Sequence, residues 1–387
     1  MDPQNPIAAV THHDPYPYYA DLIASRPFYR DDALGMWVAS SAAAVDVILM
    51  DRRLRVRPPG AQVPLTLVGT AAGTIFGHLV RMNDGSPHQA LKPAIAAAID
   101  GVDRHRVVSD AVRLLARSVG ADIGKCNLNT VLFTLPVAVV ARLLGATDQE
   151  LPIIVEAVND FVKCIPAHAT PEAIAAANQA ATQLLGIFRQ PAADRTDGLF
   201  SDLVRGTRKH SDIDSTAVAA NAIGLMSQTC EATAGLIGNT LVAFARNPDL
   251  LTLAKHKHDA IEAIVSEVAR HDAPIQNTRR FAAEACRVAG VTIAQGDAIL
   301  VVLAAANRDP QANPAPHRFM PDRNTSRIFT FGAGLHKCPG AALANSIATI
   351  VVRELIAGGL DPRGHAASVR YWPSANARIP DLGPVVG

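Results

Sequence analysis

The sequence predicts a mainly helical protein with small β-sheets, an α+β fold in which helices predominate. Residues 103–204 are rich in alanine, leucine and valine with helical spacing, and residues 214–246 form one helical pattern about thirty residues long. Short strand-like segments lie near 28–49 and 285–302. The 387 residues are 49% hydrophobic, enough for a large core. We expect one domain over 1–387, with β-rich parts at about 28–60 and 285–305 and a helical bundle at about 83–272 and 338–358.

The charge balance and the N-terminus exclude several classes of partner. There are 36 Lys and Arg against 35 Asp and Glu, so neither a nucleic acid nor an anionic membrane surface is expected as a partner. Residues 1–13 are polar and lack the apolar stretch of a signal peptide or membrane anchor. Five cysteines without paired spacing suit a reducing compartment. We therefore expect a cytoplasmic monomer without a membrane anchor.

The first hundred residues alternate between short elements and one long connection. Residues 14–24 predict a short helix, and residues 28–49 predict strand, turn, strand and helix. Residues 57–76 contain prolines and glycines without a clear period, which predicts a long ordered loop of the kind that carries binding function. Pro87 suits the first turn of a helix that opens within 83–95. His88 and Lys92 then share one face of that helix, which by itself fits a solvated polar face.

Acidic residues stand out in two helical segments. Glu231 lies in the apolar middle of residues 214–246, a helix that should end at Asn247-Pro248. A buried carboxylate needs a partner or a function, and a satisfied structural carboxylate is about as good an explanation as a functional one. In residues 261–271, Glu267 and Arg270 are spaced to face each other, as ordinary surface ion pairs also are.

A glycine-rich loop presents one cysteine immediately before a helix. The loop reads Phe-Gly-Ala-Gly-Leu-His-Lys-Cys-Pro-Gly over 331–340, and residues 341–348 continue with an apolar helical pattern. Its glycines let the backbone approach a flat ligand closely. Backbone N–H groups and the positive end of the helix favour a thiolate at Cys338, which can be the axial ligand of a haem iron. A lone cysteine beside a glycine turn is more often a buried free thiol, but the ten-residue pattern reverses that preference. The sequence has no CxxCH, which argues against covalent haem attachment.

This loop resembles the haem-ligand loop of the cytochrome P450 family, Phe-Gly-x-Gly-x-His-x-Cys-x-Gly, at every fixed position. The family's other landmarks occur in the same order, and the resemblance is strongest over 214–348. It implies a soluble, bacterial-type protein with the P450 fold, a triangular prism. Haem b, iron protoporphyrin IX, would lie between a long distal helix and the helix that follows the cysteine loop.

The resemblance also implies roles around the haem. Cys338 would be the iron ligand, Phe331 would shield the thiolate, and the loop would be shaped by Gly332, Gly334 and Gly340. Glu267, Arg270 and Arg323 would form a buried ion-pair network under the haem, which favours a defined geometry.

Two haem propionates need cationic or N–H donors. The candidates are His88, Lys92, His336 and one of the adjacent arginines Arg279 and Arg280. Lys92 stands where the family has arginine, so it keeps the charge but loses bidentate geometry.

The distal helix departs from the family pattern. The family carries Ala/Gly-Gly-x-Asp/Glu-Thr at the oxygen site, and here residues 228–233 read Gln-Thr-Cys-Glu-Ala-Thr. Glu231 matches the acid, but Ala232 replaces the threonine and carries no hydroxyl. Three explanations are open. Thr229 or Thr233 could supply the missing hydroxyl, or a substrate hydroxyl with ordered water could supply it. Alternatively, the oxidation could differ from ordinary hydroxylation. The Thr229 hydroxyl could equally well bond back to the carbonyl of Leu225 and be lost as a donor.

The implied function is that of a monooxygenase that activates O2 with two electrons. No reductase segment follows residues 371–385, so the electrons should come from NAD(P)H through a separate ferredoxin and ferredoxin reductase. The pocket-lining stretches, including a helical lid at about 152–208, are mostly apolar and imply a small to medium, largely hydrophobic substrate. Two alternatives remain open: a peroxide-using haem-thiolate enzyme and a non-enzymatic haem-thiolate sensor.

Overall fold

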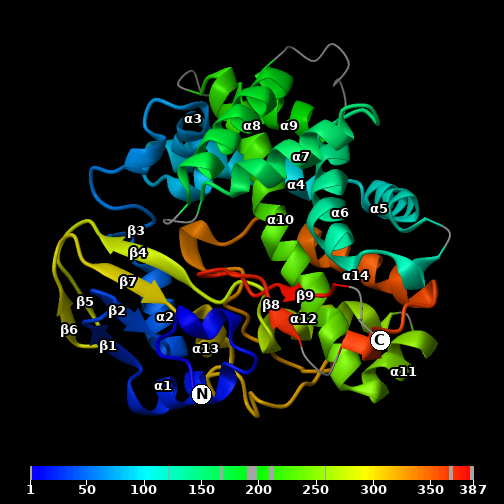
Figure 1. Ribbon diagram of the computed structural model, residues 1–387. Coiled ribbons are helices and arrows are strands. Elements are labelled where there is room, and N and C mark those ends of the chain that lie inside the picture. The colour runs from blue at the N-terminus through cyan, green and yellow to red at the C-terminus, as the bar shows by residue number, and fades with distance from the viewer. Residues whose placement is uncertain are drawn as a thin grey trace.

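Helices form most of the molecule, and a small twisted sheet occupies one corner (Figure 1). The computed structural model describes residues 2–120, 122–165, 169–189, 198–208, 213–257, 259–365 and 369–383. The two ends of the described chain lie in the lower half of Figure 1, whereas helices α3 to α9 occupy its upper half. The mainly helical fold class predicted from the sequence is confirmed.

The helices are α1 (Tyr16–Ser25), α2 (Ala42–Met50), α3 (Ala71–His78), α4 (Ser86–Asp100), α5 (Arg104–Val119), α6 (Leu128–Leu143), α7 (Leu151–Val162), α8 (Pro171–Arg189), α9 (Leu199–Thr207), α10 (Ser215–Arg246), α11 (Pro248–His256), α12 (Ala260–His271), α13 (Leu303–Asn307) and α14 (Ala341–Ala357). The strands are β1 (Phe28–Asp31), β2 (Met36–Ala39), β3 (Leu54–Arg55), β4 (Thr278–Ala282), β5 (Cys286–Val288), β6 (Val291–Ile293), β7 (Ala298–Val301), β8 (Arg370–Tyr371) and β9 (Pro380–Asp381).

Helix α10 runs through the middle of the molecule (Figure 1). It begins where the Asp214 side chain accepts a hydrogen bond from the N–H of Ala217, and it continues for 32 residues. It ends at Arg246 because Asn247 caps the next helix and Pro248 starts it. A helix of this length spans ~48 Å. Most of its residues are buried against the surrounding helices, so it forms the axis of the fold, as the sequence predicts.

Two glycines of α10 allow the chain to pass close to it. A side chain at Gly235 would lie 2.8 Å from the carbonyl oxygen of Arg378 and from Pro274, and one at Gly238 would lie 2.6 Å from Pro380. The segments before β4 and around β9 therefore pack directly on the helix backbone.

The main sheet has the strand order β1-β2-β7-β4-β3. The β2–β7 pair is parallel and the other pairs are antiparallel. The remaining strands pair as two small hairpins, β5–β6 and β8–β9. Side chains alternate along β4, so Arg280 is buried while Arg279 is exposed. The sheet therefore turns one of the two adjacent arginines inward.

One large apolar core joins the helices, and two smaller clusters lie around the sheet, one beneath α2 and one beside α1 and α13.

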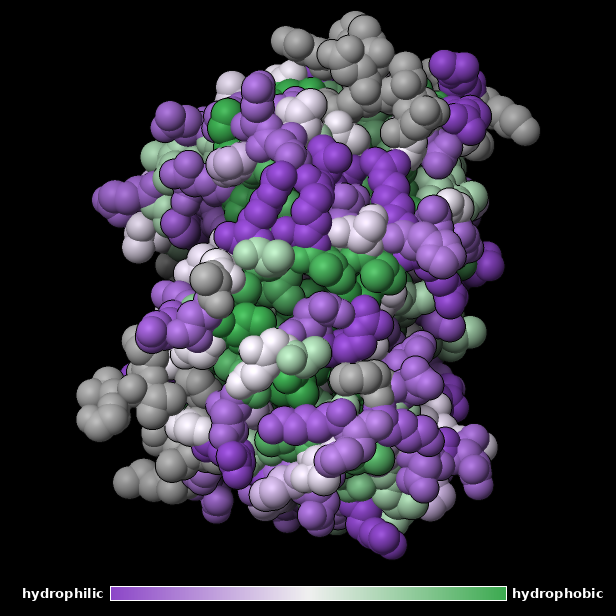
Figure 2. Space-filling view, turned by 90° about the vertical axis from the view of Figure 1, so that its right-hand side faces the viewer, coloured by the Kyte–Doolittle hydropathy of each residue, from purple (hydrophilic) through white to green (hydrophobic). Residues whose placement is uncertain are grey.

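On the surface, apolar side chains gather across the middle of the face in Figure 2. A groove on α5, α6 and α7 is lined by the apolar residues Leu114, Ala138, Leu151, Pro152 and Val155. Among the described residues, no helix combines the length and the apolarity that crossing a membrane requires.

Two expectations about local structure were wrong. The last six residues of 57–76 are not a loop, because α3 begins at Ala71 and Thr70 caps it by accepting from the N–H of Gly73. Gly73 and Gly77 weaken the helical pattern in the sequence, but burial of Ile75 and Phe76 stabilises the helix. The second β-rich part begins at Thr278 rather than 285, because β4 completes the main sheet. Parts of the predicted lid, at 166–168 and 190–197, and residues 384–385 of the final segment lie outside the described residues.

Candidate functional site: the cysteine loop and the distal helix

The cysteine loop enters α14 opposite the middle of α10. The N–H of Cys338 donates to the carbonyl of Phe331 at 2.8 Å, which closes the loop. Phe331 is half-buried and packs against the main core, and Gly340 occupies the N-cap of α14. The loop therefore sits on one end of a buried helix, in a fixed position.

Two glycines in this loop are required by its backbone. Gly332 and Gly334 have φ values of 68° and 64°, which residues with a side chain rarely adopt. At Gly334 a side chain would also lie 2.7 Å from the carbonyl oxygen of Leu49, at the end of α2. The glycine spacing of the motif therefore reflects both conformation and close packing.

The thiol of Cys338 lies beside Gly340, which lines a cavity: its Sγ is 4.0 Å from the position that a Cβ would take at Gly340. Its side chain is exposed, yet burial is the main cause that raises its pKa. The backbone N–H of Gly340 and the ammonium group of Lys92 both lower the pKa, as expected, but burial outweighs them. A bound cation would therefore be needed to hold this sulfur as a thiolate, which is how metals act on coordinating thiols.

A cluster of titratable side chains lies beside the loop. The rings of His88 and His336 are 4.4 Å apart between centroids, and His336 Nε2 is 2.9 Å from Oδ1 of Asp84. Arg280 is buried, and the charge of Asp84 acts on it. His88 Nε2 and His336 Nδ1 are buried without a hydrogen-bond partner. Two unpartnered ring nitrogens and an inward-facing guanidinium are donors available to an acidic ligand.

The other two propionate candidates are placed differently. Lys92 reaches the cysteine loop, where its Nζ donates to the carbonyl of Lys337 at 2.7 Å. It thus lies close to the sulfur. Arg279 points outward from β4, so of the adjacent pair only Arg280 joins the cluster.

Helix α10 places Glu231 and Ala232 half-buried in its middle. Burial raises the pKa of Glu231 and the charge of Arg81 lowers it, with burial the larger effect. The Thr229 hydroxyl donates to the carbonyl of Leu225 at 2.7 Å. Of the two readings that the sequence left open for this side chain, the back-bonded one is therefore present. The Thr233 hydroxyl is buried and has no partner.

A cavity separates the two helices that bear these groups. Leu225 and Thr229 of α10 line one side, and Gly340, Leu343 and Ala344 of α14 line the other. Gly340, two residues after Cys338, and the 225–229 turn of α10 therefore face the same space.

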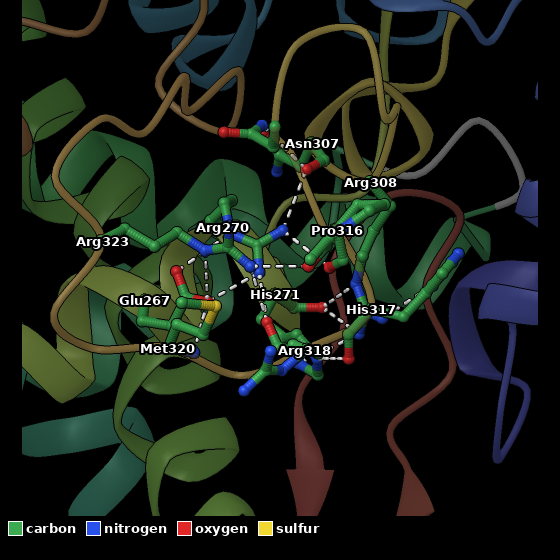
Figure 3. Close-up of polar contacts among 12 residues, drawn as sticks. Glu267, Arg270, His271, Asn307, Arg308, Pro316, His317, Arg318, Met320 and Arg323 are labelled. Carbon is green, nitrogen blue, oxygen red and sulfur yellow. Dashed lines mark hydrogen bonds and ion pairs between the residues drawn. The ribbon is translucent and has the colours of Figure 1, made fainter.

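The predicted Glu267–Arg270 pair is buried and bonded (Figure 3). Arg270 Nη2 lies 2.6 Å from Oε1 of Glu267, and Nε lies 2.9 Å from Oε2. Arg323 Nε adds a third bond to Glu267 at 3.0 Å, as predicted. Arg270 also donates to the carbonyls of Asn307, Pro316 and Arg318. The network therefore fixes the segment that leads into the cysteine loop.

Sequence reasoning missed a second buried network, here called the N-terminal network: Tyr16, Asp272, Arg308 and Arg378. Arg378 Nε donates to Asp272 Oδ1 at 2.8 Å, and Tyr16 donates to the same oxygen. Arg378 also donates to the carbonyls of Val10 and His12. Asp84 was missed as well. The residues of the N-terminal network are far apart in the sequence, and Asp84 belongs to no local pattern, so neither could be predicted from spacing. The one signal in the sequence was Arg378, a charged residue between the apolar residues Ala377 and Ile379.

The donor set fits a haem. The sulfur of Cys338 lies beside Gly340 of the cavity lining, and His88, His336 and Arg280 offer unpartnered or inward-facing N–H donors beside the cysteine loop. A thiol ligand below a long acid-bearing helix, with cationic groups for two propionates, defines the class of haem-thiolate proteins.

Comparison with known proteins shows which family this chain resembles. A family model described as Cytochrome P450 matches residues 256–357. Cytochrome P450 monooxygenase PikC of Streptomyces venezuelae is 28% identical over 89% of this chain and 83% of its own length. The 6-deoxyerythronolide B hydroxylase of Saccharopolyspora erythraea is 27% identical over 89% of this chain and 88% of its own length. The crystal structure of CalO2 shares the fold, with a TM-score of 0.85 and 21% identity over 98% of this chain and 96% of that one. Along most of its length the chain is similar to bacterial cytochrome P450s, and the named monooxygenases and hydroxylases among them support an oxidoreductase of the monooxygenase class.

Proposed function

We propose that this protein is an O2-dependent haem-thiolate monooxygenase that oxidises a small to medium, largely hydrophobic substrate. A ferredoxin and a ferredoxin reductase would deliver two electrons from NAD(P)H. One observation carries the proposal: the thiol of Cys338 lies beside Gly340, which lines a cavity whose opposite side is formed by α10, the helix that bears Glu231.

Haem b would be held at its iron by Cys338 and at its propionates by His88, His336 and Arg280. The bound haem supplies the binding and reduction of O2, with electron density pushed onto iron by the thiolate. Lys92 lies next to the sulfur and adds a positive charge there. Phe331, Gly332 and Gly340 keep the loop in the shape that presents the sulfur.

Glu231 is the group of α10 best suited to carry protons into the pocket. Because burial raises its pKa, it holds its proton more readily than an exposed glutamate. Ala232 offers no hydroxyl, and the hydroxyl proton of Thr229 is held by the Leu225 carbonyl. We infer that ordered water and a group of the substrate complete the path from Glu231.

The first test is spectroscopic. The reduced protein with CO should absorb at the wavelength typical of thiolate-ligated haem, and Cys338→Ala should abolish that band while the protein stays folded by circular dichroism. Persistence of the band in Cys338→Ala would assign the ligand to another residue and sink the proposal.

Turnover separates the remaining alternatives. A monooxygenase should oxidise substrate with NADPH, ferredoxin and ferredoxin reductase, and a peroxide-using enzyme should work with H2O2 alone. A haem-thiolate sensor should do neither, although compounds would still shift its haem spectrum. The carboxylate at Glu231 favours the first outcome, because a peroxide-using enzyme receives its protons with the oxidant.

A further inference from the structure

The turn that follows α3 is fastened to the distal helix. The N–H of Val80 donates to Oδ1 of Asn221 at 2.8 Å, and Nδ2 of Asn221 donates to the carbonyl of His78 at 2.8 Å. One turn along α10, Gly224 has no side chain, and a Cβ there would lie 2.6 Å from Leu79. Residues 78–82 therefore rest directly on α10.

This docking brings Arg81 to the acid of α10. Asn221, Gly224, Gln228 and Glu231 follow one another at spacings of three and four residues, so they share one face of the helix. Arg81 directly follows the docked residues and is half-buried. The charge of Glu231 acts on it: burial lowers the pKa of Arg81, and Glu231 raises it.

Arg81 is nevertheless not bound to a carboxylate. Its Nε is buried and has no hydrogen-bond partner, and within the described residues no acidic oxygen lies at ion-pair distance from its guanidinium. A buried N–H donor without an acceptor is costly. A group left incomplete in this way is a candidate for a ligand site.

A second arginine adds to the positive charge. Arg57 donates to the carbonyls of Met82 and Phe76 and stacks on the Phe76 ring, with its guanidinium carbon 4.4 Å from the ring centroid. Burial, followed by the charge of Arg81, lowers its pKa to about 10. Arg57 and Arg81 thus make this region positively charged, and Glu231, whose pKa burial raises, offsets at most one of the two charges. An anionic group would balance the remaining charge.

We propose that Arg81 binds a carboxylate group of the substrate, so that the natural substrate is a hydrophobic carboxylic acid. A guanidinium can form two parallel hydrogen bonds to a carboxylate. Gln228, which is exposed although it lies within a largely buried helix, keeps Nε2 on the carbonyl of Gly224 and leaves its oxygen for a polar group nearby. This inference rests on the proposed function and adds to it the chemical class of the substrate.

A haem propionate is the other carboxylate that could reach Arg81. His88, His336 and Arg280 gather around Asp84, whereas Arg81 is the cation that acts on Glu231. We therefore assign Arg81 to the substrate and the Asp84 cluster to the haem. The two sources of carboxylate are separable by experiment.

The test uses ω-(imidazol-1-yl)alkanoic acids of increasing chain length and the matching alcohols. The imidazole binds the haem iron and shifts its spectrum, while the other end explores the pocket. At the best chain length, the purified protein should bind the acid at least about tenfold more tightly than the alcohol, as expected for a charge-assisted pair. In Arg81→Gln the acid and the alcohol should bind equally well, with haem content unchanged. Arg117→Gln, which removes an exposed arginine of α5, is the matched control and should keep the preference for the acid.

Calorimetric titration with decanoate and decanol gives a second readout that does not depend on the iron. Preference for decanoate that disappears in Arg81→Gln supports the proposal. An equal preference in both proteins, or no preference in the wild type, overturns it. Loss of haem from Arg81→Gln also overturns it, because Arg81 would then hold a propionate. Failure of the proposed function would appear separately, as absence of the CO band in the wild type.

Discussion

The hydroxyl of Thr229 donates a hydrogen bond to the carbonyl oxygen of Leu225, one turn earlier on α10, at 2.7 Å. A threonine bonded in this way remains an acceptor, but its proton is already committed to the helix. Ala232, next to Glu231, has no hydroxyl, so neither Thr229 nor Ala232 offers the oxygen site a free hydroxyl proton.

Thr229→Ala should therefore leave the coupling of NADPH oxidation to product formation largely unchanged. A true proton relay would contribute ~10²–10⁴-fold, so the two cases differ clearly in H2O2 released per NADPH. Glu231→Gln is the comparison, and it should slow product formation strongly. A large rise in H2O2 release in Thr229→Ala would show that its hydroxyl leaves the Leu225 carbonyl during turnover.

Arg270→Ala should yield little haem-loaded protein. It leaves the Glu267 carboxylate buried and two partners short, and breaking one side of a buried pair typically costs ~3–5 kcal/mol. The measurement is the unfolding midpoint together with the haem-to-protein ratio. Arg363→Ala removes an arginine from an exposed pair with Asp361 and should change neither quantity. Normal haem content in Arg270→Ala would mean that Arg323 alone satisfies Glu267.

Gly334→Ala should destabilise the cysteine loop more than its conformation alone explains. Gly334 and Gly35 have φ values of 64° and 65°, but only Gly334 has a backbone oxygen 2.7 Å from the position of a Cβ. Gly35→Ala should therefore cost only the ~1–2 kcal/mol of a left-handed backbone. Gly334→Ala should cost more and reduce haem binding. Equal melting temperatures for the two variants would contradict the close packing on Leu49.

Stability should fall in mild acid because of His271. Burial, followed by the charge of Arg308, lowers the pKa of His271 to about 4 from its ordinary 6.5. Its Nδ1 lies 3.0 Å from Nη2 of Arg308 and accepts from it, so the ring is neutral in the folded protein. The unfolded chain binds the extra proton at higher pH than the folded one. Stability should thus be complete above about pH 6.5 and decline as the pH falls toward 4.

His271→Gln removes this titration while keeping an amide to accept from Arg308. Urea unfolding midpoints measured from pH 7.5 to 4.5 should decline less steeply for the variant than for the wild type. Parallel curves would show that other groups cause the acid sensitivity.

The sequence predicted those parts of the site that are contiguous or follow helical spacing. The cysteine loop lies within ten residues, and Glu267 and Arg270 are one helical turn apart, so local geometry determines both. It left open which of Arg279 and Arg280 turns inward, because that depends on the phase of β4 in a sheet assembled from distant strands. The His336–Asp84 contact was missed because its partners are 252 positions apart.

Helix α3 shows why one element was assigned wrongly. Gly73 and Gly77 lower the helical propensity of residues 71–78, and only contacts with other elements reveal that the segment is helical. Arg81 was missed for a related reason. Its importance depends on Asn221 and Gly224, which bring the turn onto α10, and no pattern around Arg81 indicates this.

The N-terminal network has a consequence for how the chain is made. Arg378 and Val10, whose carbonyl it binds, are 368 positions apart. At ~5–20 residues per second, the ribosome synthesises the N-terminal turn some tens of seconds before the arginine that holds it. Until then the N-terminal turn lacks the hydrogen bonds that Arg378 donates to the carbonyls of Val10 and His12. The newly made chain therefore passes through a period in which its first segment is available to chaperones and proteases, and translation of the last strand ends that period.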